Sequence, residues 1–365
     1  MMAVFSDQAA IGHALAFEAA LARASAAEGL IDMETSEVIA SLCGSITIDP
    51  TELAEEAALA GTLAIPLVQR LRNHLEDKAA QALHHGATSQ DLADTILMLQ
   101  TRQGAELLLA DVRRISTALY LLAERHAATP AIGRTLLQDA LPVAFGLRLA
   151  QAAAGISDAA CRLDAEVAAN AKIQFGGAAG TRSGLDGRGA SLTAHMAAEL
   201  GLASDVPWHA RRGGVAGIAS ALGIVIGVIG KFARDVSLLA QSGVGEAREP
   251  VTAGRGGSSA MAHKRNPTGC QIALSAAVRA PGLVATILSA LPQEEERGLG
   301  GWQAEGPTIA DLFLLAAGAA AAMADVAERL DIDEAAIARN LSAAVQGDDI
   351  GESAAIITAL VTQHR

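Results

Sequence analysis

Residues 254–267 concentrate side chains that could hold an anion. Their sequence is Gly-Arg-Gly-Gly-Ser-Ser-Ala-Met-Ala-His-Lys-Arg-Asn-Pro. The glycines give the backbone freedom to approach a ligand closely, and the serine hydroxyls lie near a His-Lys-Arg triplet. Asn266 followed by Pro267 predicts an N-cap and the first residue of a helix, so the positive end of that helix would face the loop. These features predict an anion-binding loop, and a basic surface turn is the alternative.

Two other loops are rich in polar residues. Residues 84–91 read His-His-Gly-Ala-Thr-Ser-Gln-Asp, and residues 133–139 read Gly-Arg-Thr-Leu-Leu-Gln-Asp. The run from Thr88 to Asp91 is also typical of a helix cap, which leaves a purely structural alternative open. Because all three loops lie between long apolar segments, we favour a functional role for them together.

Several kinds of site lack their sequence motifs. The chain contains no GxxxxGK[ST] or GxGxxG phosphate-binding pattern, no HExxH metal motif, and no GxSxG around Ser258. His84 and His85 are adjacent, so their rings should point apart and favour a chance pair over a metal site. We therefore expect neither a cofactor nor a metal. A serine in a cationic loop remains, acting as a base and not as a nucleophile.

Composition predicts an all-α protein. Hydrophobic residues make up 51% of the 365 residues and aromatic residues only 2%, so the core must consist mainly of Ala, Leu, Ile and Val. The net charge of -13 argues against a nucleic-acid partner, because nothing would neutralise a phosphate backbone over a broad surface. Three well-separated cysteines, and no basic segment before Asp7 to indicate a signal peptide, suggest a reducing, cytoplasmic location.

Hydrophobic periodicity and capping residues predict long helices whose ends carry the polar loops. Ser6 and Asp333 are expected caps, Gly29 ends the first helix, and residues 129–142 form a connector. We predict helices over residues 6–28, 34–42, 51–83 with breaks at Gly61 and Pro66, 91–127, 142–170, 191–200, 215–241, 267–291 and 307–330, and two shorter ones after them. The expected domains are residues 1–95, 96–330 and 331–365.

Residues 213–230 contain no charged side chain and could be mistaken for a membrane span. Lys231, Arg234 and Asp235 continue the same helical pattern. A helix that is apolar all round is also found buried in a large protein, so we interpret it as buried at a subunit interface. Gly223 and Gly227, four residues apart, would allow close contact with another helix.

The three loops carry a specific resemblance. Residues 257–267 resemble the GSSxMPxKxNP signature of the fumarase/aspartase superfamily, which includes argininosuccinate and adenylosuccinate lyases. Residues 85–91 resemble the first shared region of that family and residues 133–142 the second, in the same order. The resemblance extends from the N-terminal helix to about Leu341. Ala262 departs from it, since proline is usual there, which puts the closed geometry of the loop in doubt.

The resemblance implies a homotetramer with a 20-helix core and active sites built from the loops of three subunits. Family members remove a proton beside a carboxylate while a group leaves the next carbon. By this matching Ser258 would be the base, with Lys264 stabilising its alkoxide, and Lys264 and Asn266 would bind a small di- or tricarboxylate substrate. The other expected substrate-binding residues are His85, Thr88, Ser89, Gln90, Thr135, Gln138, Ser259 and Met261.

Leu136 stands where the lyases of the family have a histidine that serves the leaving amine or water. Leucine transfers no proton, but a carboxylate, whose conjugate acid has a pKa of about 4, attacks or departs without such help. This favours the lactonising branch of the family, which acts on 3-carboxy-cis,cis-muconate, and residues 300–305, Gly-Gly-Trp-Gln-Ala-Glu, resemble that branch.

Several alternatives stay open. The chain could be an adenylosuccinate lyase, which its Lys-Arg-Asn-Pro suggests, or a non-catalytic homologue. The substrate's 3-substituent could be a sulfonate instead of a carboxylate, and Ser258 or Lys264 could move the proton. Only residues 331–365 follow the central bundle, fewer than the family's usual last domain. We expect activity to survive this because the three loops precede that point.

Overall fold

The computed structural model describes residues 1–251, 256–257, 261, 264–345 and 347–364. These form two compact units. Unit 1 comprises residues 1–105, 166–218 and 285–310, and unit 2 comprises residues 106–165, 219–284 and 311–365. The boundaries of these two units differ from those of the three expected domains. The division into three domains stays a prediction.

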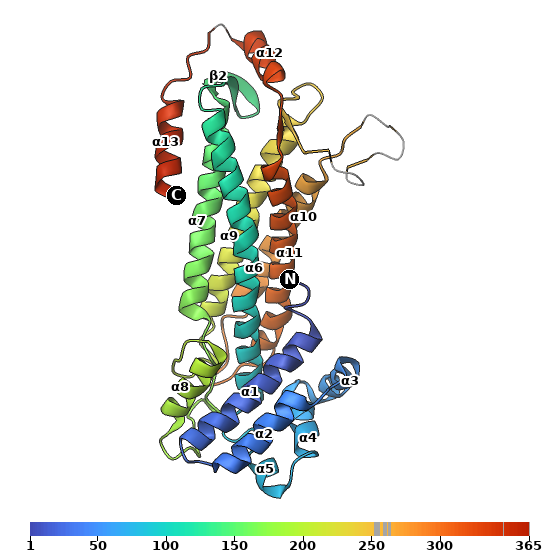
Figure 1. The fold of residues 1–365 in the computed structure, drawn as a ribbon, viewed down its shortest axis with the longest axis vertical. Coiled ribbons are helices and arrows are strands. Elements are labelled where there is room, and N and C mark those ends of the chain that lie inside the picture. Colours follow the sequence, from blue (N-terminus) through green and yellow to red (C-terminus); the bar gives the residue numbers. More distant parts are fainter. Residues whose placement is uncertain (252–255, 258–260, 262–263, 346, 365) are drawn as a thin grey trace. The chain divides into compact units, whose positions relative to one another are not determined.

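Unit 1 contains the short helices that precede the first polar loop. α1 packs against α2 and α8, and Figure 1 shows α1 and α2 side by side. The side chains of Phe17 and Leu21 on α1 and Ile39 on α2 are buried. The N-cap predicted at Ser6 is confirmed, because its side chain accepts the N–H of Ala9. The helices that lie entirely in this unit are α1 (Asp7–Ala27), α2 (Met33–Ser45), α3 (Pro50–Ala60), α4 (Ala64–Arg72), α5 (Asp77–Ala82) and α8 (Gly189–Leu200).

Five long helices each contribute residues to both units. Within unit 2, Phe145, Phe232 and Phe313 come from three of them and are completely buried. The alanine-rich surfaces around these rings allow close helix packing. The long helices are α6 (Ser89–Arg125), α7 (Phe145–Asn170), α9 (Gly213–Leu239), α10 (Thr268–Ser289) and α11 (Gly301–Glu328).

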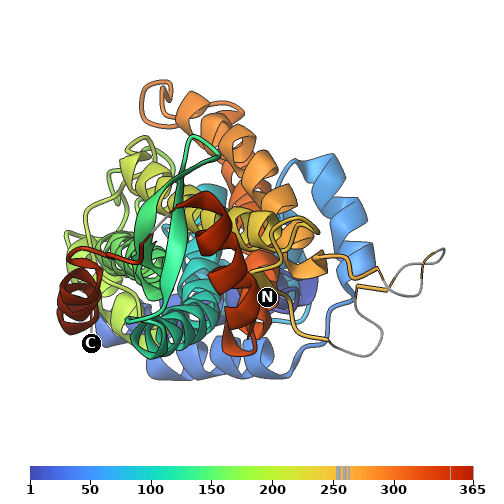
Figure 2. The ribbon, with the colours of Figure 1, turned by 90° about the horizontal axis from the view of Figure 1, so that it is seen from above.

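Unit 2 also contains two small antiparallel sheets and the last two helices. Both views show the β1–β2 hairpin beside α12 (Figure 1, Figure 2). Asp333 caps α12 as predicted, since its side chain accepts the N–H of Ala336. The elements are β1 (Pro130–Thr135), β2 (Gln138–Ala144), β3 (Ala247–Arg248), β4 (Asp331–Ile332), α12 (Glu334–Ala344) and α13 (Ser353–His364).

The predicted all-α class is confirmed, but the connector expected over residues 129–142 is wrong. The segment forms a hairpin in which Arg134 pairs with Asp139 and Thr135 with Gln138. Its turn consists of Leu136 and Leu137, with φ of 53° and 64°. Two-residue turns of this kind favour Asn-Gly because both positions need a positive φ, so Leu-Leu gives no turn signal.

The predicted starts of two helices are also wrong. Pro142 does not open α7 but pairs with Ile132 inside the hairpin. α11 starts six residues before Pro307, whereas α10 starts at Thr268, one residue after its predicted start. The N–H of Gly300 donates to Oε1 of Gln303 at 2.9 Å, a side-chain cap that starts α11 earlier than its proline suggests.

Three helices in the described part of the chain, α9, α10 and α11, are long and apolar enough to cross a membrane. In the most apolar 18-residue window of α9, 56% of the residues are buried. Close contact with α10 occurs at Gly223, where an added Cβ would lie 2.8 Å from Val284, and at Gly230, where it would lie 2.7 Å from Ala277. Gly227 has nothing within 4 Å, so its predicted contact is not made with the described residues.

Candidate active site

Asp91, near the start of α6, fixes the backbone of the first polar loop. Its Oδ2 accepts the N–H groups of Thr88 at 3.0 Å and Gly177 at 2.9 Å. Its Oδ1 accepts the N–H of Gly176 at 2.9 Å and lies 2.7 Å from Nε2 of His209. The bond back to Thr88 is that of a capping box, so the cap interpretation of this segment is confirmed. The buried carboxylate holds the loop in one arrangement.

The predicted substrate residues of this loop differ in exposure. Thr88 and Ser89 are half-buried at the N-terminus of α6, while His85 is exposed with Nε2 3.4 Å from the carbonyl oxygen of Gly184. The hydroxyl of Thr88 accepts a hydrogen bond from the guanidinium of Arg297. A hydroxyl and a guanidinium at a helix N-terminus are suited to binding a carboxylate.

Gln90 lies below this surface and is completely buried. Its Nε2 donates to the carbonyl oxygen of His209 at 3.0 Å and to Oδ2 of Asp94 at 3.2 Å. In this arrangement Gln90 supports the loop from the inside. Its contact with substrate stays a prediction.

A buried ion-pair network, formed by Arg212, Asp94 and Glu305, lies in the same unit. Nη1 and Nη2 of Arg212 each donate to an oxygen of Asp94 at 2.8 Å, and Nε donates to Oε1 of Glu305 at 3.1 Å. The guanidinium carbon lies 4.7 Å above the ring of Trp208. Burial acts to lower the pKa of Arg212, but the two carboxylates outweigh it and raise that pKa. The network connects α6, through Asp94, with α11, through Glu305.

The second polar loop is the tip of the β1–β2 hairpin in unit 2. Thr135 and Gln138 are paired there, and both are exposed. The turn residues Leu136 and Leu137 are 92% and 81% exposed. Backbone strain at two leucines that contact little of their own chain is typical of a functional loop.

The third loop is described in part. Ser258 and Ser259, the predicted base and its neighbour, lie outside the described residues. Lys264 is exposed, and its N–H donates to the carbonyl oxygen of Met261 at 3.1 Å. Asn266 is not the N-cap of α10, because the helix begins at Thr268 and Glu249 accepts the N–H groups of its first turn. Nδ2 of Asn266 donates to the carbonyl oxygen of Gly257 at 3.3 Å.

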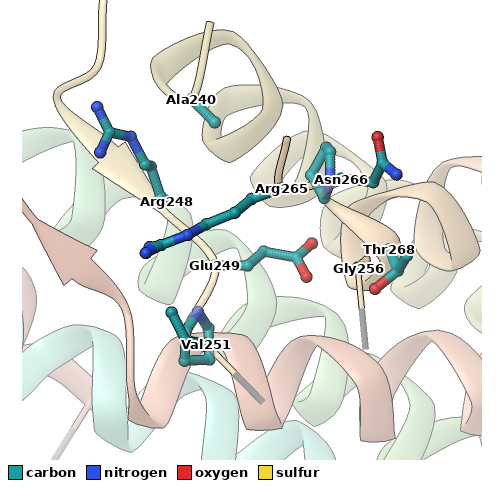
Figure 3. A pocket seen from close by; sticks show the side chains of 10 residues that line it. Ala240, Arg248, Glu249, Val251, Gly256, Arg265, Asn266 and Thr268 are labelled. Carbon is teal, nitrogen blue, oxygen red and sulfur yellow. The ribbon is translucent and has the colours of Figure 1, made fainter. Parts of the chain in front are cut away.

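Glu249 lies at the N-terminus of α10, the helix end where the sequence predicted an anion-binding site. Its two carboxylate oxygens accept the N–H groups of Gly269 at 3.0 Å and Cys270 at 2.7 Å. Figure 3 shows Glu249 in a pocket that Arg248 and Arg265 also line. A carboxylate of the chain itself therefore neutralises the positive end of α10.

The predicted site residues fall into separate groups. His85, Thr88, Ser89 and Gln90 belong to unit 1, and Thr135, Gln138, Met261, Lys264 and Asn266 belong to unit 2. The pocket in Figure 3 is lined by Asn266 but by neither Thr135 nor Gln138. Among the described residues of unit 2, those at the hairpin tip therefore do not line this pocket.

Sequence reasoning missed the residues that support these loops. Glu305 lies in residues 300–305, the segment that resembles the lactonising branch, but its partner Arg212 is 93 positions away. Arg297 follows three glutamates and looks like part of a solvated charged run. Charge and spacing in one sequence give no signal for such long-range pairs.

Comparisons with known proteins agree with this architecture. The model of a family described as lyase matches residues 1–282. The 3-carboxy-cis,cis-muconate cycloisomerase of Bradyrhizobium diazoefficiens is 45% identical, over 94% of this chain and 77% of the relative. The protein of the same name from Pseudomonas aeruginosa is also 45% identical, over 93% and 75%.

A solved structure is similar over the whole chain. The 3-carboxy-cis,cis-muconate lactonizing enzyme from Pseudomonas putida superposes with a TM-score of 0.93 at 34% identity, covering 100% of this chain and 96% of that one. The family match and these identities show that the chain is an enzyme of the lyase family, within the fumarase/aspartase superfamily that its three loops resemble.

Proposed function

We propose that this protein is a cycloisomerase that converts 3-carboxy-cis,cis-muconate to its muconolactone in the degradation of aromatic compounds. The names of relatives at 45% identity support this activity. The observation in the chain itself that carries the proposal is Leu136, an apolar residue beside Thr135 at the tip of the hairpin.

The proposed reaction forms one bond and moves one proton. An oxygen of one substrate carboxylate adds to a carbon of a double bond, and the π electrons move to the neighbouring carbon next to another carboxylate. That carbon then takes a proton from Ser258 or Lys264, which regains one from solvent, and the lactone in its acid form is an isomer of the substrate acid. The attacking carboxylate is already ionised at neutral pH, so a side chain without a titratable group suffices at position 136.

Cations and hydroxyls on three loops suit a substrate with several negative charges. Thr88 and Ser89 would hydrogen-bond one carboxylate, Thr135 and Gln138 another, and Lys264 the charge that develops during addition. His85, Gln90, Ser259, Met261 and Asn266 complete the proposed substrate-binding set. A sulfonate at the 3-position would present comparable charge to these groups.

We also propose that the active sites form in a homotetramer. On α10, the apolar side chains of Ile272 and Val278 are 49% and 80% exposed. At the hairpin tip Leu136 and Leu137 extend into solvent. Other subunits would cover these surfaces, so that residues of the two units meet across subunits in a cytoplasmic enzyme.

Purified protein incubated with 3-carboxy-cis,cis-muconate tests the activity. Loss of the conjugated-diene absorbance with formation of the lactone supports the proposal. Release of fumarate from adenylosuccinate, without turnover of the muconate, would instead assign the lyase reaction. If the protein turns over neither substrate, the chain is a non-catalytic homologue, and Ser258→Ala should then change nothing measurable.

A further inference from the structure

Glu246 is a buried carboxylate that contacts three separate elements of unit 2. Its Oε1 accepts hydrogen bonds from Nη2 of Arg134 at 2.6 Å and from Nδ2 of Asn340 at 2.8 Å. Its Oε2 accepts from Nη1 of Arg134 at 3.0 Å and, more weakly, from Nη1 of Arg148 at 3.4 Å. These four residues, from β1, α7, α12 and the segment before β3, are called the Glu246 cluster.

The carboxylate at the centre of the cluster is fully buried. The Glu246 side chain is 0% exposed, whereas those of Arg134 and Arg148 are 24% and 19% exposed. The two parallel N–H···O bonds from Arg134 fix both the distance and the orientation of its guanidinium. Burial acts to raise the pKa of Glu246, but the hydrogen bonds from Arg134 and Asn340 and the charge of Arg148 outweigh it and lower that pKa. The carboxylate therefore stays ionised at neutral pH.

Arg134 connects this cluster to the hairpin tip. It directly precedes Thr135, and its Nε lies 3.3 Å from Oδ1 of Asp139, its partner across the hairpin. The register of β1 and β2 shifts between Ile132 and Arg134, so regular pairing alone does not set the position of the tip. The bidentate bond to Glu246 supplies a second, rigid attachment next to Thr135.

Asn340 connects the same cluster to the C-terminal segment. Besides Glu246, its Nδ2 donates to the carbonyl oxygen of Val244 at 2.9 Å. The N–H of Asp333 donates to the carbonyl oxygen of Glu246 at 3.0 Å. Residues 331–344 thus hold Glu246 through both its side chain and its backbone.

We infer that Glu246 is a positioning residue, which with Asn340 of α12 places the hairpin tip carrying Thr135 and Gln138 for binding a substrate carboxylate. The substrate part of this inference rests on the proposed function. The inference also assigns a role to the C-terminal residues 331–344. They would affect substrate binding through Glu246, although none of the three loops lies among them.

Steady-state kinetics with the muconate substrate separate positioning from simple stabilisation. Asn340→Ala removes one donor while leaving the Glu246–Arg134 pair intact, and Glu246→Gln removes the charge while keeping the shape. Because each loses a buried hydrogen bond to a charged group, we expect KM to rise about 3- to 10-fold for Asn340→Ala and more for Glu246→Gln, with kcat within about twofold. Glu328→Gln, which weakens the exposed pair of Glu328 with Arg114, is the matched control and should leave KM unchanged.

Amide hydrogen exchange gives a readout that does not depend on activity. In the Asn340→Ala variant, the amides of residues 134–139 should exchange at least severalfold faster than the same amides in Glu328→Gln. The two variants are compared at equal melting temperature, or after correction for their difference in global stability. If the wild-type protein shows no turnover, the proposed function fails, and the exchange result alone then decides whether the cluster holds the hairpin tip. Unchanged exchange in this segment, or an unchanged KM in an active enzyme for both cluster variants, would overturn the inference.

Discussion

The N–H of Asn266 donates to the carbonyl oxygen of Gly256 at 2.8 Å, and so joins the two ends of the segment that contains Ser258 and Lys264. Gly256 has a φ of 74°, and a Cβ added there would lie 2.7 Å from the carbonyl oxygen of Asn266. Both features require glycine at this position. The bond holds Asn266, a predicted substrate ligand, at a fixed place in the loop.

Gly256→Ala should therefore impair catalysis. The left-handed backbone alone costs an alanine about 1–2 kcal/mol, and the clash adds to it, so we expect kcat/KM to fall by roughly tenfold or more. Gly257→Ala is the matched control, because a Cβ there has nothing within 4 Å among the described residues. Equal kinetic effects of the two substitutions would contradict the role given to Gly256.

The buried Arg212 network should dominate the stability of its unit. Glu305→Gln leaves the guanidinium with one carboxylate fewer in a site without water access, and removal of one member of a buried ion pair costs about 3–5 kcal/mol. The comparison is Arg114→Gln on the surface, where the loss should stay below about 1 kcal/mol because the side chain is 42% exposed. Urea denaturation measures both free energies of unfolding. Similar losses for the two variants would show that the buried network is not specially stabilising.

The lowered pKa of Glu246 predicts a dependence of stability on pH. In the unfolded chain the carboxyl has its ordinary pKa of 4.5, and in the folded chain its pKa is lower. The folded state therefore binds fewer protons in this range, and the contribution to stability is complete above 4.5 and is lost as the pH falls through the folded value. Glu246→Gln should show a smaller loss of unfolding free energy between pH 6 and acid than the wild type, a comparison made by denaturation at about 0.5-unit steps. Parallel curves for the two proteins would refute this assignment.

Position 136 should tolerate substitution far better than Ser258. If Leu136 only fills space, Leu136→Ala keeps kcat within a few-fold, whereas removal of a residue that transfers a proton costs about 10²–10⁴-fold. Ser258→Ala should show the larger loss unless Lys264 moves the proton, in which case Lys264→Met should show it. A 10²-fold or larger loss of kcat in Leu136→Ala would mean that this residue takes a direct part in the reaction.

Local signals in the sequence predicted much of the fold. Ser6 and Asp333 cap helices where their side chains and the following apolar periodicity indicated. The hairpin was missed because Leu136 and Leu137 adopt a positive φ, a conformation that their residue types do not favour. Helix starts were misplaced where a side-chain cap, such as Gln303 for Gly300, preceded a proline that looked like the stronger signal.

The loops could be located from sequence, but their support could not. Thr88, Thr135 and Lys264 lie in motifs of recognisable composition. Glu246 and Arg134 are 112 residues apart, and no pattern in one chain predicts that pair. The prediction that the positive N-terminus of α10 is available to an anion was also wrong. The pattern of residues 254–267 does not show that Glu249 caps this helix.

Incubation of the purified protein with 3-carboxy-cis,cis-muconate, followed by identification of the product by NMR, tests the central claim most directly. The account predicts loss of the conjugated diene and formation of one muconolactone, with one solvent-derived proton on the carbon next to a carboxylate. Absence of that lactone with a correctly assembled protein, together with release of fumarate from adenylosuccinate, would contradict it.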